Sequence, residues 1–272
     1  MEDLKETARQ IRIKIVKMLH KAKSGHTGGS LGMTDIFTAL YFGDIINKNI
    51  FSKNEDRDRF ILSNGHICPV WYATLAQNGY LKDEELMTLR DVNSRLEGHP
   101  VNHGFDVVEL PTGSLGQGIS AAVGLAYGYK MDNKKSNVFV GLGDGEMNEG
   151  SVWEALMAGA HYKLDNLIAF VDRNHIQQGG KTEDMMKLDP LNEKVKAFGW
   201  NVIETDGHDF DSIKEAFNKA KENKNGPSFI IFKTHIGKGV SFMEDGYEWH
   251  GMPPNDDQLQ KALIELGEGG VN

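Results

Sequence analysis

Two polar side chains, Asp144 and Asn174, lie 30 residues apart, and each shortly follows an apolar stretch of the sequence. The stretches 137–142 and 166–171 are bounded by polar residues, as buried strands are, and 151–162 between them has the pattern of a helix. In open α/β sheets, ligands bind at the edge where the strands end. A carboxylate and an amide oxygen there suit a hard cation such as Mg2+, which would hold a phosphate-bearing ligand.

The run Gly143-Asp144-Gly145 does not identify a site by itself. A calcium loop starting at Asp144 fails because Glu149 stands where the obligate glycine belongs and Ala155 where the final glutamate belongs. A nicotinamide site is disfavoured because no Gly-x-Gly-x-x-Gly follows a strand. A purely structural turn stays open at this point.

Four histidines stand in four separate segments that are predicted to be loops. His26 lies in the glycine-rich stretch 24–32, His66 follows the short strand predicted at 59–62, and His99 precedes a proline that favours an extended, stiff backbone. His250 lies in a long arm without a helix or strand pattern. An arm of that length is usually functional or docks on a partner.

The composition excludes several classes of protein. The formal net charge of −9 argues against a general nucleic-acid or anionic-membrane binder. A single cysteine, Cys68, rules out an internal disulfide, fits a reducing compartment, and is interpreted as a small buried residue. The segment Met1 to Glu6 carries no targeting signal, and no apolar run approaches the roughly 20 residues that span a bilayer. We therefore expect a cytoplasmic protein.

Strands alternate with helices along the chain, and hairpin signals are missing. This pattern predicts an α/β fold with a mainly parallel sheet and helices on both faces. We expect one domain over residues 1–272, with 235–255 as an arm at the site. The predicted helices include 35–42, 83–90 and 259–266, and Thr34 and Asp83 are expected to cap the first two.

The motifs together are more specific than any one of them. Gly143-Asp144-Gly145 followed by Asn174 resembles the signature of the thiamine diphosphate enzymes. Five further segments resemble transketolase in order and spacing: Ser24-Gly25-His26, Leu62-Ser63-Asn64-Gly65-His66, Gly98-His99-Pro100, Thr112-Gly113-Ser114-Leu115-Gly116-Gln117-Gly118 and Trp249-His250-Gly251. The resemblance covers about residues 10 to 255 and implies the thiamine diphosphate-binding fold.

The resemblance also implies a role for each matched position. Asp144, Asn174 and the backbone carbonyl of Ile176 would hold Mg2+, for which Ca2+ or Mn2+ can substitute, against the cofactor diphosphate. Further cofactor contacts are implied for His66, Gly113, Leu115, Gly143, Gly145, Glu149, Ile236 and His250. Among these, His66 and Gly145 would touch the diphosphate, Gly113 and Leu115 the aminopyrimidine ring, and Ile236 would support the cofactor.

His26, His99 and His250 resemble the catalytic donors around the carbonyl and first hydroxyls of the substrate. The reaction implied is transfer of a two-carbon ketol unit from a ketose phosphate to an aldose phosphate, as in the pentose phosphate pathway, and imidazoles suit its proton transfers. Glu149 and Glu154 also resemble acidic residues at the family's subunit interface, although Glu154 could equally be an ordinary exposed residue.

The family continues into a pyrimidine-binding domain and a C-terminal domain, which carry the cofactor-activating glutamate and most of the substrate phosphate contacts. The chain is therefore expected to be the N-terminal subunit of a split transketolase, paired with a C-terminal subunit in an α2β2 heterotetramer.

Three alternatives stay open. They are another thiamine diphosphate enzyme (a 2-oxoacid dehydrogenase α subunit or a 1-deoxyxylulose-phosphate synthase), a non-catalytic subunit that keeps the cleft, and a transketolase for an unusual sugar phosphate.

Overall fold

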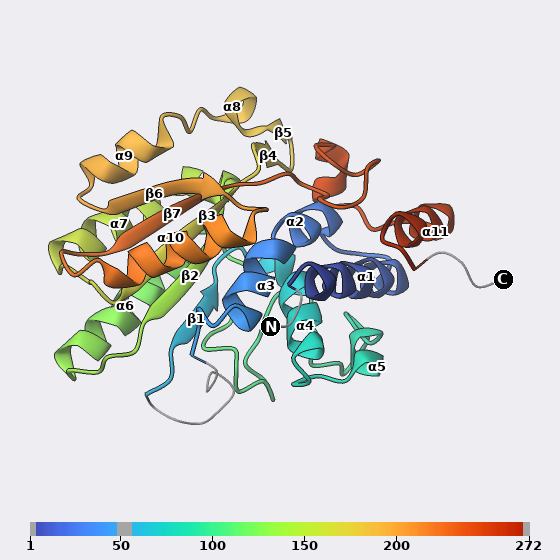
Figure 1. Cartoon of the computed structure of the whole chain (residues 1–272), viewed down its shortest axis with the longest axis horizontal. Coiled ribbons are helices and arrows are strands. Elements are labelled where there is room, and N and C mark those ends of the chain that lie inside the picture. The colour runs from blue at the N-terminus through green and yellow to red at the C-terminus, as the bar shows by residue number, and fades with distance from the viewer. Residues whose placement is uncertain (1–3, 48–55, 269–272) are drawn as a thin grey trace.

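The computed structural model describes residues 4–47 and 56–268, and Figure 1 shows how their helices surround a central sheet. Met1 to Asp3, part of the segment without a targeting signal, lie outside the described residues. The five-stranded sheet has the order β1-β2-β3-β7-β6, and every neighbouring pair is parallel. Its strands are β1 (Arg59–Leu62), β2 (Val138–Gly143), β3 (Leu167–Arg173), β6 (Asn201–Asp206) and β7 (Ser228–Lys233). The predicted α/β class is confirmed.

Alternate residues of β1, β2, β3 and β7 enter two different cores, which is why these strands are nearly continuous apolar runs in the sequence. In β3, Phe170 packs in one core while its neighbours Ala169 and Val171 pack in the other. The first core is formed with α1 (Leu4–Ala22), α3 (Thr34–Phe42), α4 (Cys68–Gln77), α10 (Phe210–Glu222) and α11 (Asp256–Glu265). The second core is formed with α6 (Gln117–Met131), α7 (Gly150–His161) and α9 (Leu191–Ala197).

Helices therefore cover both faces of the sheet, with α10 across one face and α6 and α7 across the other (Figure 1). None of the described helices is long and apolar enough to cross a membrane. Cys68 is buried as predicted, and burial raises the pKa of its thiol to about 12. This thiol is therefore a packing group under ordinary conditions.

The glycine-rich stretch around His26 is partly helical, which the prediction of a loop missed. Thr27–Gly32 forms a buried helix, α2, directly after His26. A Cβ at Gly28 would lie 2.5 Å from Ile236 Cγ1, so the small residues let this helix press against the arm. Tertiary packing has here overridden the low helix propensity of glycine.

Both predicted helix caps are wrong. The Thr34 hydroxyl donates to the Ser30 carbonyl oxygen at 3.0 Å, so it bonds to α2 and leaves the start of α3 uncapped. Asp83 pairs with Lys14, and its helix α5 (Asp83–Leu86) ends well before residue 90. The last helix starts at Asp256, before the predicted residue 259, because Asn255 caps it and Gln258 completes a capping box.

The stretch after Asn174 contains a hairpin that the sequence patterns did not predict. β4 (Ile176–Gln177) pairs antiparallel with β5 (Gly180–Lys181), and the short helix α8 (Thr182–Met185) follows. Gly180 has φ +140°, a conformation that glycine adopts readily. The hairpin brings α8 back to the edge of the sheet where Asp144 lies.

Candidate cofactor-binding and active site

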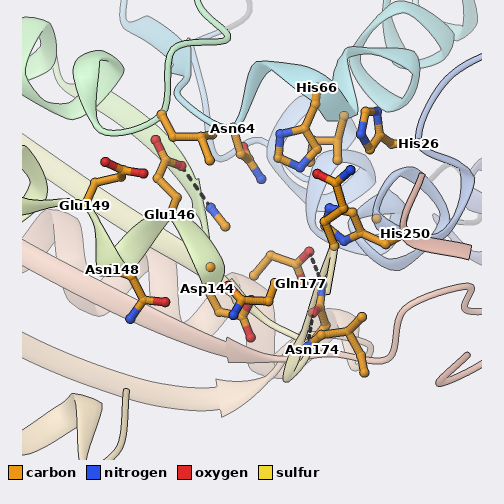
Figure 2. Close-up of a pocket in the computed structure, with 18 of the residues that line it drawn as sticks. His26, Asn64, His66, Asp144, Glu146, Asn148, Glu149, Asn174, Gln177 and His250 are labelled. Carbon is orange, nitrogen blue, oxygen red and sulfur yellow. Dashed lines mark hydrogen bonds between the residues drawn. The ribbon is translucent and has the colours of Figure 1, made fainter. Parts of the chain in front are cut away.

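A cavity of about 650 Å³ opens at the carboxyl edge of the sheet, and its lining contains nearly all the predicted site residues (Figure 2). They are His26, His66, His99, Gly113, Leu115, Gly143, Asp144, Gly145, Glu149, Asn174, Ile176 and His250. Ile236 is the exception: it is fully buried behind Gly28. Glu154 is exposed on α7 and is not part of the lining. The structure thus assembles these positions, while their individual roles stay predictions.

Three histidines form one wall of the cavity. The ring centroids of His26 and His66 are 4.8 Å apart, and each lies 5.6 Å from the ring of His250. They come from the start of α2, the turn after β1 and the arm, and Figure 2 shows them grouped together. His99 lies against Gly113, where a Cβ would approach its Cδ2 to 2.7 Å. Gly113 has φ +136°, so glycine is needed there both for space and for backbone conformation.

All four imidazoles have lowered pKa values, and burial is the largest cause for each of them. Burial, followed by the charges of His250, His99 and Arg90, lowers the pKa of His26 to about 4. Burial and the neighbouring histidines lower the pKa of His66 well below its ordinary value, and burial lowers the pKa of His250. Burial and Arg90 lower the pKa of His99. At neutral pH these rings are therefore uncharged.

The lowered pKa of His26 predicts that the chain loses stability in mild acid. Between the ordinary value of 6.5 and about 4, the unfolded chain binds a proton at this position and the folded chain does not. The free energy of unfolding should therefore fall as pH decreases through this window, by up to about 1.4 kcal/mol per pH unit for this one group, and His26 should add no further slope below it. Urea unfolding from pH 7 to pH 4 should show a shallower loss for His26→Asn.

The exposed histidine His161 provides the matched control, because its replacement by asparagine removes no buried imidazole. An identical acid slope in His26→Asn and the unaltered chain would contradict this assignment.

Asp144 lies at the end of β2 among groups that hold its side chain in place. Its Oδ2 accepts hydrogen bonds from Arg173 Nη1 at 3.0 Å and from Thr182 Oγ1 at 3.1 Å. Arg173 also pairs with Glu183 at 2.6 Å and with Asp189 at 3.0 Å. Burial raises the pKa of Asp144 to about 6, against the opposing effect of Arg173.

Asn174 lies beside Asp144 because β2 and β3 are paired with their ends level, Gly143 opposite Asp172. The Asn174 Oδ1 accepts a hydrogen bond from the backbone N–H of Ile176 at 2.9 Å, and its Nδ2 donates to Asp172 Oδ2 at 2.8 Å. Burial raises the pKa of Asp172 to about 7, and the nearby Asp144 adds to that effect. Two carboxylates and an amide thus meet at one sheet edge.

Glu146 ties together three segments of the site and has no role in the sequence prediction. Its buried carboxylate accepts from the Ser63 hydroxyl, from the Gly116 N–H at 2.8 Å and from the Gly143 N–H at 3.1 Å. These donors belong to the turn after β1, the 112–118 turn and the end of β2. A single side chain therefore fixes the turn that carries Gly113 and Leu115 relative to Asp144.

A chain of polar contacts fixes the arm to helices α1 and α3. The buried Asp35 accepts from Arg12 at 2.7 Å and from His208 Nδ1 at 2.8 Å. Arg12 Nε also donates to the Lys238 carbonyl at 2.9 Å, and the His235 N–H donates to His208 Nε2 at 2.9 Å. These contacts hold the backbone on both sides of Ile236. They place the arm that carries His250 over α2.

The cavity contains buried polar atoms that a ligand or water would satisfy. Five buried side-chain atoms in the described part of the chain have no hydrogen-bond partner, and three of them, His26 Nδ1, Asn64 Oδ1 and Asn148 Oδ1, belong to residues that line this cavity. Such atoms are rare in folded proteins unless a ligand or water satisfies them. Asp144, Asn174 and the Ile176 carbonyl are hard oxygen donors, which suits Mg2+ with a diphosphate.

The described residues contain no cluster of three or more histidine, cysteine or acidic side chains able to hold a metal. The predicted ligand set differs from such a cluster, because it has one carboxylate and two neutral oxygens.

The sequence prediction missed Asn64, Asp172, Arg173 and Gln177. Asp172 could have been found, because it stands two residues before Asn174 at the end of an apolar strand.

Comparison with known proteins agrees with this geometry. The family model of the transketolase thiamine diphosphate binding domain matches residues 4–269. The chain belongs to the transketolase family. It is 41% identical over 266 residues to a protein of Actinobacillus succinogenes that is named as one subunit of apulose-4-phosphate transketolase, covering 97% of this chain and 96% of that protein.

Full-length transketolases extend well beyond this match. The chain is 39% identical over 268 residues to the transketolase of Homo sapiens, covering 98% of this chain but 42% of that protein. The solved transketolase of Leishmania mexicana has a TM-score of 0.92 at 32% identity, covering 100% of this chain and 43% of that one. The chain thus corresponds to the thiamine diphosphate-binding part of a transketolase. The predicted family resemblance and fold are confirmed.

Proposed function

We propose that the chain is the N-terminal subunit of a split transketolase that transfers a two-carbon ketol unit between sugar phosphates, with thiamine diphosphate and Mg2+. The observation that carries this proposal is the cavity in which His26, His66, His99 and His250 face Asp144 and Asn174. When bound, thiamine diphosphate supplies the carbon nucleophile and the electron sink of this reaction.

The charges around the cavity support a divalent cation. Asp144, Asp172, Glu146 and Glu149 line it, and the nearest buried cation, Arg173, is already paired with three carboxylates. A diphosphate placed here alone would meet net negative charge. A divalent cation held by Asp144 would offset that repulsion and would favour the ionised forms of Asp144 and Asp172, whose pKa values burial has raised.

The histidines are suited to bind substrate oxygens. His26 is uncharged at neutral pH, so it offers one N–H donor to a carbonyl or hydroxyl oxygen of the substrate. His99 and His250 lie on the same cavity and can donate to, or take a proton from, neighbouring hydroxyls. Because Gly113 admits the His99 ring, this imidazole is held between the turn and the cavity.

A C-terminal partner chain is part of this proposal. The two relatives named as subunits of apulose-4-phosphate transketolase match the chain almost end to end, while full-length transketolase continues well past the match. On the cavity rim, Met185 and Met186 are 52% and 63% exposed, as expected of apolar side chains that a partner covers. The α2β2 stoichiometry and cytoplasmic location stay proposals that rest on the family and on the single buried cysteine.

A transketolase for a less common sugar phosphate is a second candidate. The relatives from Phocaeicola vulgatus and Actinobacillus succinogenes are both named as one subunit of apulose-4-phosphate transketolase, and they are 39% and 41% identical to this chain. This specificity shares the cavity and cofactor of the first candidate. It differs only in the groups that bind the far end of the sugar.

The decisive experiment compares the chain alone with the chain co-purified with its C-terminal partner. We expect little or no ketol transfer by the chain alone. The complex should turn over a ketose phosphate in the presence of thiamine diphosphate and Mg2+, because the cofactor-activating glutamate lies on the partner in this proposal. Xylulose 5-phosphate and apulose 4-phosphate as donors, with ribose 5-phosphate as acceptor, separate the two candidates.

The complex assayed without added cofactor, after dialysis against a chelator, is the control. Robust turnover by the isolated chain would refute the split enzyme. Pyruvate decarboxylation without ketol transfer would favour another thiamine diphosphate enzyme.

A further inference from the structure

Asp172 is a buried carboxylate at the cavity whose individual hydrogen bonds the proposed function does not yet explain. It stands near the end of β3, 2% exposed, and lines the same cavity as Asp144. Its Oδ1 accepts from the Thr234 hydroxyl, and its Oδ2 accepts from Asn174 Nδ2 at 2.8 Å. Burying a carboxylate is costly unless it is hydrogen-bonded, and each oxygen of Asp172 accepts one hydrogen bond.

Asp172 contacts Asn174, whose amide can bind a cation in only one of its two orientations. The amide of Asn174 has an oxygen that can bind a cation and an NH2 group that cannot. Both oxygens of Asp172 act as acceptors, one for the Thr234 hydroxyl and the other for the Asn174 NH2 group, so Asp172 draws that NH2 group toward itself. The opposite end of the amide agrees, because Asn174 Oδ1 accepts from the Ile176 N–H at 2.9 Å.

Both contacts therefore select the same one of the two amide orientations. An amide oxygen has two lone pairs, and the Ile176 N–H uses one of them. The other remains for a ligand at the cavity, which Asn174 lines. Rotating the amide by half a turn would place NH2 donors against both the Ile176 N–H and the cation.

We propose that Asp172 is a positioning residue that fixes the amide of Asn174 so that its oxygen faces the cation accompanying the cofactor diphosphate. This inference rests on the proposed function, because it assumes that a metal and a diphosphate occupy the cavity. Thr234 supports the arrangement by holding the other oxygen of Asp172. Outer contacts of this kind commonly orient metal ligands in proteins.

The test is the affinity of the full chain, alone and with its C-terminal partner, for Mn2+ in the presence of thiamine diphosphate, measured by electron paramagnetic resonance. Asp172→Asn should weaken Mn2+ binding about 10- to 100-fold. An asparagine at 172 can present either an oxygen or an NH2 group, so it no longer selects one orientation of Asn174.

The double variant Asp172→Asn with Asn174→Asp should restore most of the affinity, because a carboxylate at 174 presents oxygen in both directions. A merely structural role of Asp172 would not be rescued this way. Asp58→Asn is the matched control: Asp58 is also buried and accepts backbone N–H bonds from Asn47 and Asn137, but it lies at the opposite edge of the sheet. It should leave Mn2+ affinity unchanged.

The outcomes separate this inference from the proposed function. Absence of Mn2+ binding by the unaltered protein would overturn the cofactor site and the inference with it. Normal binding by Asp172→Asn, or weak binding that the double variant does not rescue, would overturn the inference alone. If Asp172→Asn does not fold, Thr234→Val is tested in its place. The Mn2+ affinity of Thr234→Val should be lower than that of the unaltered protein. An unchanged affinity would count against the proposal.

Discussion

Replacing Asp144 with alanine is expected to abolish the metal-dependent binding of thiamine diphosphate. Asp144 is the only anionic side chain among the proposed metal ligands, so the cation would keep only two neutral oxygens from the chain. We expect the affinity measured by calorimetric titration with Mg2+ present to fall by more than about 100-fold, beyond the range usual for outer contacts to a metal site.

The fold should tolerate this change better than the site does. Arg173, which loses Asp144 as a partner, keeps its ion pairs with Glu183 and Asp189. Asp144→Asn keeps the shape of the side chain and should retain part of the affinity. Asp184→Ala, which removes an exposed carboxylate from α8, is the control. Unchanged Mg2+-dependent binding in Asp144→Ala would show that the metal assignment is wrong.

Replacing Glu146 with alanine is expected to destabilise the chain by about 3 kcal/mol, because it leaves buried donors without an acceptor. Those donors are the Ser63 hydroxyl and the N–H groups of Gly116 and Gly143. Urea unfolding at pH 7 measures the loss. The cofactor affinity should fall as well, since the turn that carries Gly113 and Leu115 loses its link to the end of β2.

Glu146→Gln separates the two effects, because its amide oxygen still accepts while its NH2 group faces donors. Its loss should lie between that of Glu146→Ala and that of the unaltered chain. Glu149→Ala, three residues on and exposed, should have little effect on stability. If Glu146→Ala unfolds at the same urea concentration as the unaltered chain, the three hydrogen bonds do not hold the site together.

The sequence by itself determined the parallel sheet, the edge at which the site lies and part of the set of residues that meet there. This was possible because apolar runs such as 166–171 must be buried on both faces, and because parallel strands end at a common edge. Each side chain that stands just past such a strand, as Asp144 and Asn174 do, is then placed by topology alone. The histidine loops followed from local patterns, and the roles of the histidines were implied by the family resemblance.

Only the tertiary structure decided the contacts that hold those residues. Glu146 and Asp172 act through groups distant in the chain, Ser63 and Gly116 for the first and Thr234 for the second, and no local pattern records such pairs. The helix at Thr27–Gly32 forms for the same reason: packing against Ile236 stabilises it where local propensity would not. Residue types and spacing indicate which chemistry the sheet edge can perform. The geometry that this chemistry requires depends on long-range hydrogen bonds and close packing.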